Sequence, residues 1–338
     1  MKDHHLTLPA LSDPFDIGSV TIRNRSVLAP MSGVTDLPFR RLAWRFGAGL
    51  VVTEMVASRE LVANRGESWA RLKNAGMVPH MVQLAGREAY WMAEAAKISA
   101  DNGAGIIDIN MGCPAKKVTG GYSGSALMRE PDHALSLIEA TVKAVDVPVT
   151  LKMRLGWDSD SINAPEIAAR AQAAGVKLIT IHGRTRMQFY EGRADWDAIK
   201  AVRDVISVPL IANGDVETST DASEILRRSG ADAVMVGRGA QGQPWLPAVL
   251  AGHAPPAPGE IADIAVEHYE MMLEFYGIEA GLRHARKHLG WYLDRFAPDM
   301  KTDDKVAIMT SKNTGQVVAL LRSALQQGAE RQSARKAA

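Results

Sequence analysis

The sequence predicts a (β/α)₈ TIM barrel followed by a small all-helical domain. Eight short apolar runs rich in β-branched residues recur in the first 237 residues, with helix-like segments between them, and this alternation is typical of a parallel sheet. The ends of successive runs lie 24 to 43 residues apart, which is close to one strand and one helix each. An open doubly wound sheet is the alternative, but eight near-equal units and polar residues at the strand ends favour the barrel.

The elements can be assigned in chain order from their periodicity. The predicted strands end at Met31, Met55, Gln83, Asn110, Met153, His182, Asn213 and Gly237. Between the fourth and fifth strands, residues 132–145 place apolar side chains at the spacing of one helix face. A later helix should begin after Asn163, which can cap it in a capping box with Glu166, and should end near Ala174 because Gly175 follows.

The residue composition and the hydrophobic pattern change after the eighth predicted strand. Residues 251–259 are rich in proline, which breaks helices and is typical of a linker. Helical patterns follow at residues 261–276 and 281–296, whereas the polar tail from residue 328 should fray. We therefore expect a catalytic barrel at residues 1–250 and a helical domain at residues 260–338.

Composition bounds the classes of function. The chain has 39 Lys plus Arg against 38 Asp plus Glu, a net charge of +1, which excludes a uniformly cationic coat for nucleic acid, so any such surface must be local. The single cysteine cannot form an intrachain disulfide, as expected in a reducing compartment. The first 18 residues contain no secretory core, and no run of 18 apolar residues occurs, so we expect a cytoplasmic protein without a membrane segment.

Polar side chains follow most of the predicted strands, and in a barrel they converge on one mouth. They include no carboxylate pair for glycoside hydrolysis and no metal-binding cluster, so no metal is expected. The loops Asn213-Gly214-Asp215 and Gly237-Arg238-Gly239 follow strands seven and eight, where barrels bind phosphate. The alternative is that their glycines serve only tight turns. Residues 237–242 also match GxGxxG, but they follow the last strand, so a dinucleotide fold is not indicated.

Lys152 and Gln83 suit the pyrimidine edge of a flavin. A strand-end lysine can stabilise the negative charge of a reduced ring, and an amide can hydrogen-bond the same edge. The alternatives are a lysine that reaches solvent and a glutamine in an ordinary loop contact. His182 can donate as a neutral imidazole, or it can be a buried histidine without a catalytic role.

Cys113 lies in a long glycine-rich loop after the fourth strand. Gly112 and Pro114 flank it, and Lys116 and Lys117 follow, which should stabilise a thiolate. A buried free cysteine is usually a small hydrophobic residue, but this setting fits better a mobile loop that carries a donor.

Six segments together resemble one known family. They are APMSGVTDLPFR (29–40), DINMGCPAKKV (108–118), LKMRLGW (151–157), IHGRTR (181–186), ANGD (212–215) and GRGAQGQPW (237–245). These motifs resemble the tRNA-dihydrouridine synthases, most closely the bacterial B subgroup, and ARKHLGWYL (285–293) extends the resemblance into the helical domain. One departure is Ser32, where this family frequently has alanine.

The resemblance implies an FMN-bearing barrel that uses NADPH to reduce the C5=C6 bond of selected uridines in the D-loop of tRNA, with position 17 expected. It implies Cys113 as the proton donor. No obligate protein partner is evident from the sequence. The residues it assigns to FMN are Pro30, Met31, Ser32, Gln83, Lys152, His182, Asn213, Gly214, Asp215, Gly237 and Arg238.

A base inside folded tRNA must turn outward to reach a barrel mouth. Candidates to hold it are Asn110, Lys116, Arg154 and Arg184. In the helical domain, Arg283, Arg286 and Lys287 form a basic strip that the resemblance favours as an RNA contact, although such a strip is more commonly a solvated face.

Two other functions remain open from sequence. An FMN barrel acting on a free small molecule, similar to dihydroorotate dehydrogenase, would not need residues 260–325. A non-catalytic tRNA-binding protein would carry no flavin.

Overall fold

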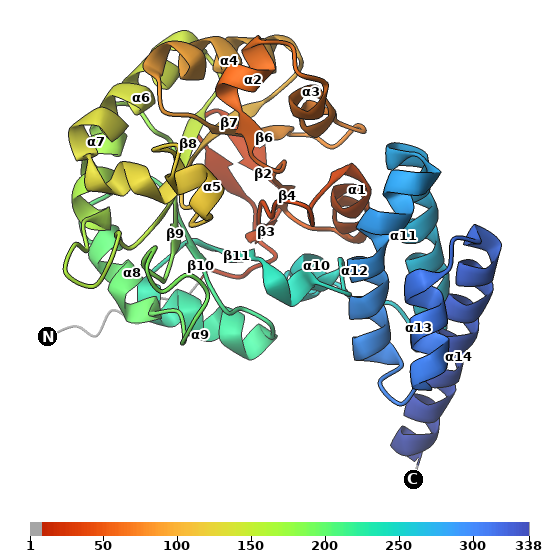
Figure 1. Cartoon of the computed structure of the whole chain (residues 1–338). Helices are drawn as coiled ribbons and strands as arrows, with labels where there is room; N and C mark the ends of the chain where they lie inside the picture. The colour runs from red at the N-terminus through yellow and green to blue at the C-terminus, as the bar shows by residue number, and fades with distance from the viewer. Residues whose placement is uncertain (1–8, 338) are drawn as a thin grey trace, which may run out of the picture.

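The computed structural model describes residues 9–337, with the side chains of residues 335–337 excepted. Residues 1–8, which belong to the segment expected to lack a secretory core, and Ala338 lie outside the described residues. Figure 1 shows a barrel of strands surrounded by helices, with a group of long helices on one side.

One parallel sheet forms the barrel. Its strand order is β4-β3-β11-β10-β9-β8-β7-β6-β5, and a parallel bridge between Val52 and Met81 joins the end of β4 to β6, so the sheet closes on itself. The predicted barrel is confirmed. The strands are β3 (Ser26–Leu28), β4 (Leu50–Val51), β5 (Val56–Ala57), β6 (Met81–Ala85), β7 (Ile106–Met111), β8 (Val149–Arg154), β9 (Ile179–His182), β10 (Leu210–Asn213) and β11 (Ala233–Val236).

Two features of the strands differ from the sequence prediction. The predicted strand ending at Met55 is only two residues long as β4, and a separate strand β5 follows it. An antiparallel hairpin of β1 (Phe15–Ile17) and β2 (Val20–Ile22) was not predicted. Its apolar side chains share one cluster with Met81, Ile106 and Ala233, the first residues of three barrel strands. The hairpin therefore covers the N-terminal end of the barrel, opposite the mouth.

Helices surround the sheet, most of them on the outside of the barrel. They are α1 (Leu37–Phe46), α2 (Ser58–Val62), α3 (Gly66–Leu72), α4 (Ala89–Asp101), α5 (Lys116–Thr119), α6 (Pro131–Ala144), α7 (Ala164–Ala173), α8 (Trp196–Arg203), α9 (Ser219–Ser229) and α10 (Leu246–Leu250), with 3₁₀ helices η1 (Gly124–Arg129), η2 (Arg238–Ala240) and η3 (Pro258–Glu260). The helix predicted at residues 132–145 is confirmed as α6.

The predicted capping box at the start of α7 is wrong. Asn163 precedes the helix as predicted, but its side chain makes no capping hydrogen bond. Its Nδ2 instead donates to the carbonyl of Met128 at 2.7 Å and ties α7 to η1. Gly175 ends the helix with φ +105°, a conformation that favours glycine.

The C-terminal helices are α11 (Ile261–Tyr276), α12 (Ile278–Phe296), α13 (Thr302–Thr310) and α14 (Thr314–Ala337). The prediction that the tail frays is wrong, because α14 continues to Ala337. Earlier in α14, the apolar residues Val317, Leu321 and Leu325 are buried in the hydrophobic cluster of the helical group. The helical group has its own hydrophobic cluster, which Trp245 joins from the barrel side.

Direct bonds fix the helical group to the barrel. Tyr276 Oη of α11 donates to Asp36 Oδ2 at 3.0 Å, and Arg45 of α1 pairs with Glu267 at 2.6 Å. Figure 1 shows α11 and α12 beside α1 and α10, on the side of the barrel away from α6 and α7.

Candidate active site

A cavity of about 410 Å³ opens at the C-terminal ends of the strands, the face on which barrel enzymes carry their active sites. The structure brings most of the predicted site residues together around it: Pro30, Met31, Ser32, Gln83, Asn110, Cys113, Lys152, Arg154, His182, Arg184, Asn213, Gly214, Asp215, Gly237 and Arg238. Lys116, Arg283, Arg286 and Lys287 do not line it.

A buried amide network holds Gln83 in place. Its Nε2 donates to Asp108 Oδ2 at 2.7 Å, and its Oε1 accepts from Asn110 Nδ2 at 2.7 Å. Thr150 Oγ1 donates to the other oxygen of Asp108 at 2.6 Å. Gln83 is therefore not an ordinary loop contact: it is 1% exposed, and its orientation is fixed. Sequence reasoning missed Asp108, although a carboxylate inside a β-rich run was a signal for it.

Lys152 is a buried cation in the cavity wall. Its Nζ donates to Asn213 Oδ1 at 3.2 Å, and Asn213 Nδ2 in turn donates to the carbonyl of Met235 at 2.8 Å. Burial, and then the nearby charge of Arg154, lower the pKa of Lys152 to about 8. The lysine does not reach solvent, and it remains mainly charged at neutral pH.

The Cys113 thiol keeps its proton at neutral pH. Burial raises the pKa of Cys113 above its ordinary value, although a backbone hydrogen bond from Ala115 and the charges of Arg154 and Lys152 oppose this effect. The expected stabilisation of a thiolate by Lys116 and Lys117 is therefore wrong. A protonated thiol suits a proton donor better than a nucleophile.

The backbone around Cys113 is anchored on both sides. Its N–H donates to Asn110 Oδ1 at 3.0 Å, and its carbonyl accepts from Ser125 Oγ at 2.9 Å. Asn110 thus holds both Gln83 and the cysteine loop.

Arg184 was predicted to hold the substrate, but in the structure its side chain binds other parts of the protein. It is 1% exposed, and its guanidinium donates to Asp215, at 2.9 and 2.6 Å, and to the carbonyls of Glu191 and Gly192. With Nη1 also facing His182 Nε2 at 3.3 Å, its five donors are used within the protein. Arg184 therefore shapes the loop after β9 and has no N–H group left to donate to a substrate.

Arg154 also uses several of its donors to hold loops of the protein in place. Its Nε donates to the carbonyl of Gly112 at 2.9 Å, and its Nη1 donates to the carbonyls of Thr185 and Phe189, each at 2.8 Å. It joins the cysteine loop to the loop after β9 while its guanidinium lines the cavity.

The loops after β10 and β11 expose backbone to the cavity. Gly214 has φ +126°, and a Cβ there would lie 2.6 Å from the Cβ of Ala194, so only glycine fits. Asp215 pairs with Arg184 and, at 3.2 Å, with Arg238, and so it holds both arginines. Burial, followed by the charge of Arg154, lowers the pKa of His182 well below its ordinary value, so the imidazole is neutral.

Two aromatic residues at the rim were missed. Phe189 and Tyr190 line the cavity and are 40% and 44% exposed. The Tyr190 ring lies 5.4 Å from the guanidinium of Arg154 and 5.0 Å from that of Arg238. Adjacent aromatics in an otherwise polar loop were the available signal, and exposed rings beside cations can stack on a planar ligand.

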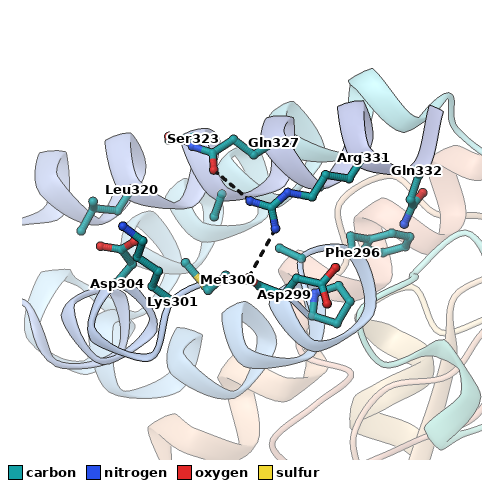
Figure 2. Close-up of a pocket in the computed structure, with 14 residues that line it drawn as sticks. Phe296, Asp299, Met300, Lys301, Asp304, Leu320, Ser323, Gln327, Arg331 and Gln332 are labelled. Carbon is teal, nitrogen blue, oxygen red and sulfur yellow. Dashed lines mark hydrogen bonds between the residues drawn. The ribbon is translucent and has the colours of Figure 1, made fainter. Parts of the chain in front are cut away.

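A second cavity, of about 350 Å³, lies in the helical group. Figure 2 shows Arg331 of α14 reaching the carbonyl of Asp299 and the side chain of Gln327. None of the predicted site residues lines this cavity, so the barrel mouth is the candidate active site.

Comparisons with known proteins agree with this architecture. The family model described as dihydrouridine synthase (Dus) matches residues 27–329. Among solved structures, morphinone reductase has a TM-score of 0.51 at 14% identity, over 75% of this chain and 92% of that one, which shows the shared fold alone. No helix within residues 9–337 is long and apolar enough to cross a membrane.

Curated relatives match over most of their length. A probable tRNA-dihydrouridine synthase of Rhizobium leguminosarum bv. phaseoli is 76% identical over 310 residues, covering 92% of this chain and 98% of the relative. The tRNA-dihydrouridine synthase B of Pseudomonas aeruginosa is 46% identical over 285 residues, covering 82% and 86%. The resemblance inferred from the motifs is confirmed, and the chain therefore belongs to the dihydrouridine synthase family of enzymes.

Proposed function

We propose that this protein is a cytoplasmic enzyme that reduces the C5=C6 bond of selected uridines in the D-loop of tRNA, with FMN as its cofactor and NADPH as the reductant. The observation that carries the proposal is the joint presence, in one cavity, of a protonated thiol and a set of fixed amide and cationic donors. We assign tRNA binding to the helical domain at residues 260–338 and chemistry to the barrel.

The cavity residues fit FMN. A volume of about 410 Å³ lies within the range of small-molecule pockets. The buried cation of Lys152 and the fixed amide of Gln83 suit the pyrimidine edge of the flavin, and the exposed backbone at Gly214 and Gly237 with Arg238 suits its phosphate. Pro30, Met31, Ser32, His182, Asn213 and Asp215 complete the set that we assign to the cofactor.

In the proposed reaction the flavin supplies the hydride, and residues of the chain supply the proton and the positioning. When bound, the flavin supplies the hydride that C6 of the uracil accepts. The Cys113 Sγ–H donates its proton to C5, and its raised pKa keeps that proton available at neutral pH. Asn110 and Ser125 hold the cysteine backbone in position, while Arg154 orients the loop beside it.

An absorbance experiment tests the proposal. The purified protein should show a flavin spectrum that NADPH bleaches without oxygen and that recovers when tRNA lacking dihydrouridine is added. Mass spectrometry of the digested tRNA should then find dihydrouridine, and mapping should place it in the D-loop, with position 17 expected.

Other outcomes would support the alternatives. Recovery with a free pyrimidine but not with tRNA would favour a small-molecule reductase. A colourless protein that cannot be reconstituted with FMN, yet binds tRNA, would leave a non-catalytic RNA-binding role.

A further inference from the structure

Three side chains form a cationic cluster on the rim of the barrel mouth, outside the cavity. The guanidinium of Arg129 lies 5.0 Å from the ring centroid of Trp157, and that of Arg186 lies 4.8 Å from it. Arg129 ends η1, and the other two lie in the loops after β8 and β9. We call Arg129, Trp157 and Arg186 the arginine–tryptophan cluster.

The backbone beneath the cluster is fixed relative to the active site. The N–H of Arg186 donates to the carbonyl of Gly156 at 3.0 Å, and that of Met187 donates to the carbonyl of Trp157 at 2.8 Å. Arg154, which lines the cavity, donates to the carbonyl of Thr185 at 2.8 Å. The two loops therefore place the cluster and the cavity wall as one unit.

The charge of the cluster is not neutralised within the described residues. Neither Arg129 nor Arg186 has a carboxylate within ion-pairing distance there, whereas Arg170, on α7, pairs with both Asp132 and Glu166. The Nε of Arg186 is also buried without a hydrogen-bond partner. Because both guanidinium groups contact one indole, their charges lie within about 10 Å of each other, roughly one Debye length. Paired, unneutralised guanidinium groups are suited to anions such as phosphate.

The cluster faces the helical group across the mouth. In the closed sheet, β3 and β8 are separated by β11, β10 and β9, which places them on opposite sides of an eight-unit barrel. The loop after β3 contains Gly33, where a Cβ would lie 3.2 Å from Lys287 Nζ of α12. A strand that enters the mouth between these sides would meet cations on both.

We propose that the arginine–tryptophan cluster binds the sugar–phosphate backbone of the RNA strand that carries the target uridine, with one guanidinium on each of two phosphates. The indole of Trp157 orients the two guanidinium groups instead of stacking on a base. This inference rests on the proposed function, because it takes tRNA as the substrate.

The test compares binding of tRNA that lacks dihydrouridine over a range of salt concentrations. The double variant Arg129→Ala, Arg186→Ala should bind at least tenfold more weakly at low salt, because it loses two charge-assisted contacts. The slope of log K against log salt should become shallower by about 1.4 to 1.8, which corresponds to two phosphate contacts. Arg170→Ala, which removes an arginine already paired with two carboxylates, is the matched control and should keep the wild-type slope.

Each outcome is informative. If the double variant folds and binds tRNA with the wild-type affinity and salt slope, the inference is wrong while the proposed function stands. If it loses thermal stability but keeps the salt slope, the arginines only pack Trp157, and the inference is again wrong. Arg129→Lys, Arg186→Lys should restore most of the slope, because it keeps both charges. If the wild-type protein itself does not bind this tRNA, the proposed function fails first.

Discussion

In the proposed reaction, the thiol of Cys113 must hold its proton until the base is in place, and burial favours this by raising its pKa. We expect Cys113→Ala to retain FMN and to oxidise NADPH, but to form dihydrouridine about 10² to 10⁴ times more slowly, the usual contribution of a general acid. Single-turnover assays with tRNA lacking dihydrouridine would measure this. Dihydrouridine formation at the wild-type rate would show that another group delivers the proton.

The charge of Lys152 should control the affinity of the protein for FMN. With a pKa of about 8, Lys152 of the free protein loses its charge as the pH rises from 7 to 9. A neutral amine donates a weaker hydrogen bond to the pyrimidine edge of the flavin, so the affinity for FMN should fall over that range. Lys152→Met should bind FMN at least tenfold more weakly at pH 7, the loss expected for a charged hydrogen bond, and should lack the fall. Titration of FMN into apoprotein would measure both effects. Lys200→Met, which removes an exposed lysine paired with Asp204, is the control, and an unchanged affinity in Lys152→Met would remove Lys152 from the cofactor site.

Which residues line the cavity was largely predictable, because barrel geometry sends every strand end to one mouth. Lys152 and Asn213 were found in this way. The use of each donor was not predictable. The guanidinium of Arg184 is used up by carbonyls of a loop whose path depends on tertiary packing, and Tyr190 reaches the cavity only through that same loop.

At the scale of elements, the first turn of α1 links the barrel to the helical group. Asp36 caps α1 by accepting from the N–H of Phe39 at 3.0 Å, and it also accepts from Tyr276 Oη of α11. Burial raises the pKa of Asp36 to about 6, from an ordinary value of 3.8. Since the folded state holds the proton more tightly than the unfolded state, this group makes the protein less stable as the pH rises from about 4 to 6.

We therefore expect Asp36→Asn to remove that pH dependence. Asparagine caps helices as well as aspartate does, and the variant should be more stable above pH 6 by up to about 3 kcal/mol, the equivalent of a two-unit shift. Urea unfolding at pH 4.5 and pH 7 would measure the difference from wild type. Asp195→Asn is the control, because Asp195 caps α8 and hydrogen-bonds no residue of the helical group within the part of the chain that the structure describes. Equal changes in the two variants would contradict the assignment.

Element prediction succeeded where periodicity was long. The helices α6 and α11 were predicted because several turns repeat one apolar face. The hairpin of β1 and β2 was missed because three-residue strands carry too little pattern. The end of α14 was mistaken for a frayed tail because residues 328–337 are mainly polar and repeat no apolar face, although the helix continues through them.

At the scale of the whole molecule, a net charge of +1 means that any surface for tRNA must be a local group of cations. Lys287 reaches from α12 toward Gly33 at the mouth and forms no ion pair within the described residues, whereas Arg283 on the same helix pairs with Glu279 at 2.8 Å. The two cations therefore differ in how free they are to meet a phosphate.

Lys287→Ala should weaken tRNA binding for every tRNA sequence and make the salt slope shallower by about 0.7 to 0.9, because one phosphate contact is lost. Arg283→Ala should change the slope less, since its charge is already offset by Glu279. Equilibrium binding of tRNA at several salt concentrations would measure both variants. If both change the slope equally, α12 acts as a diffuse basic face. If neither does, RNA is held by the barrel rim alone, and the helical group contributes shape instead of charge.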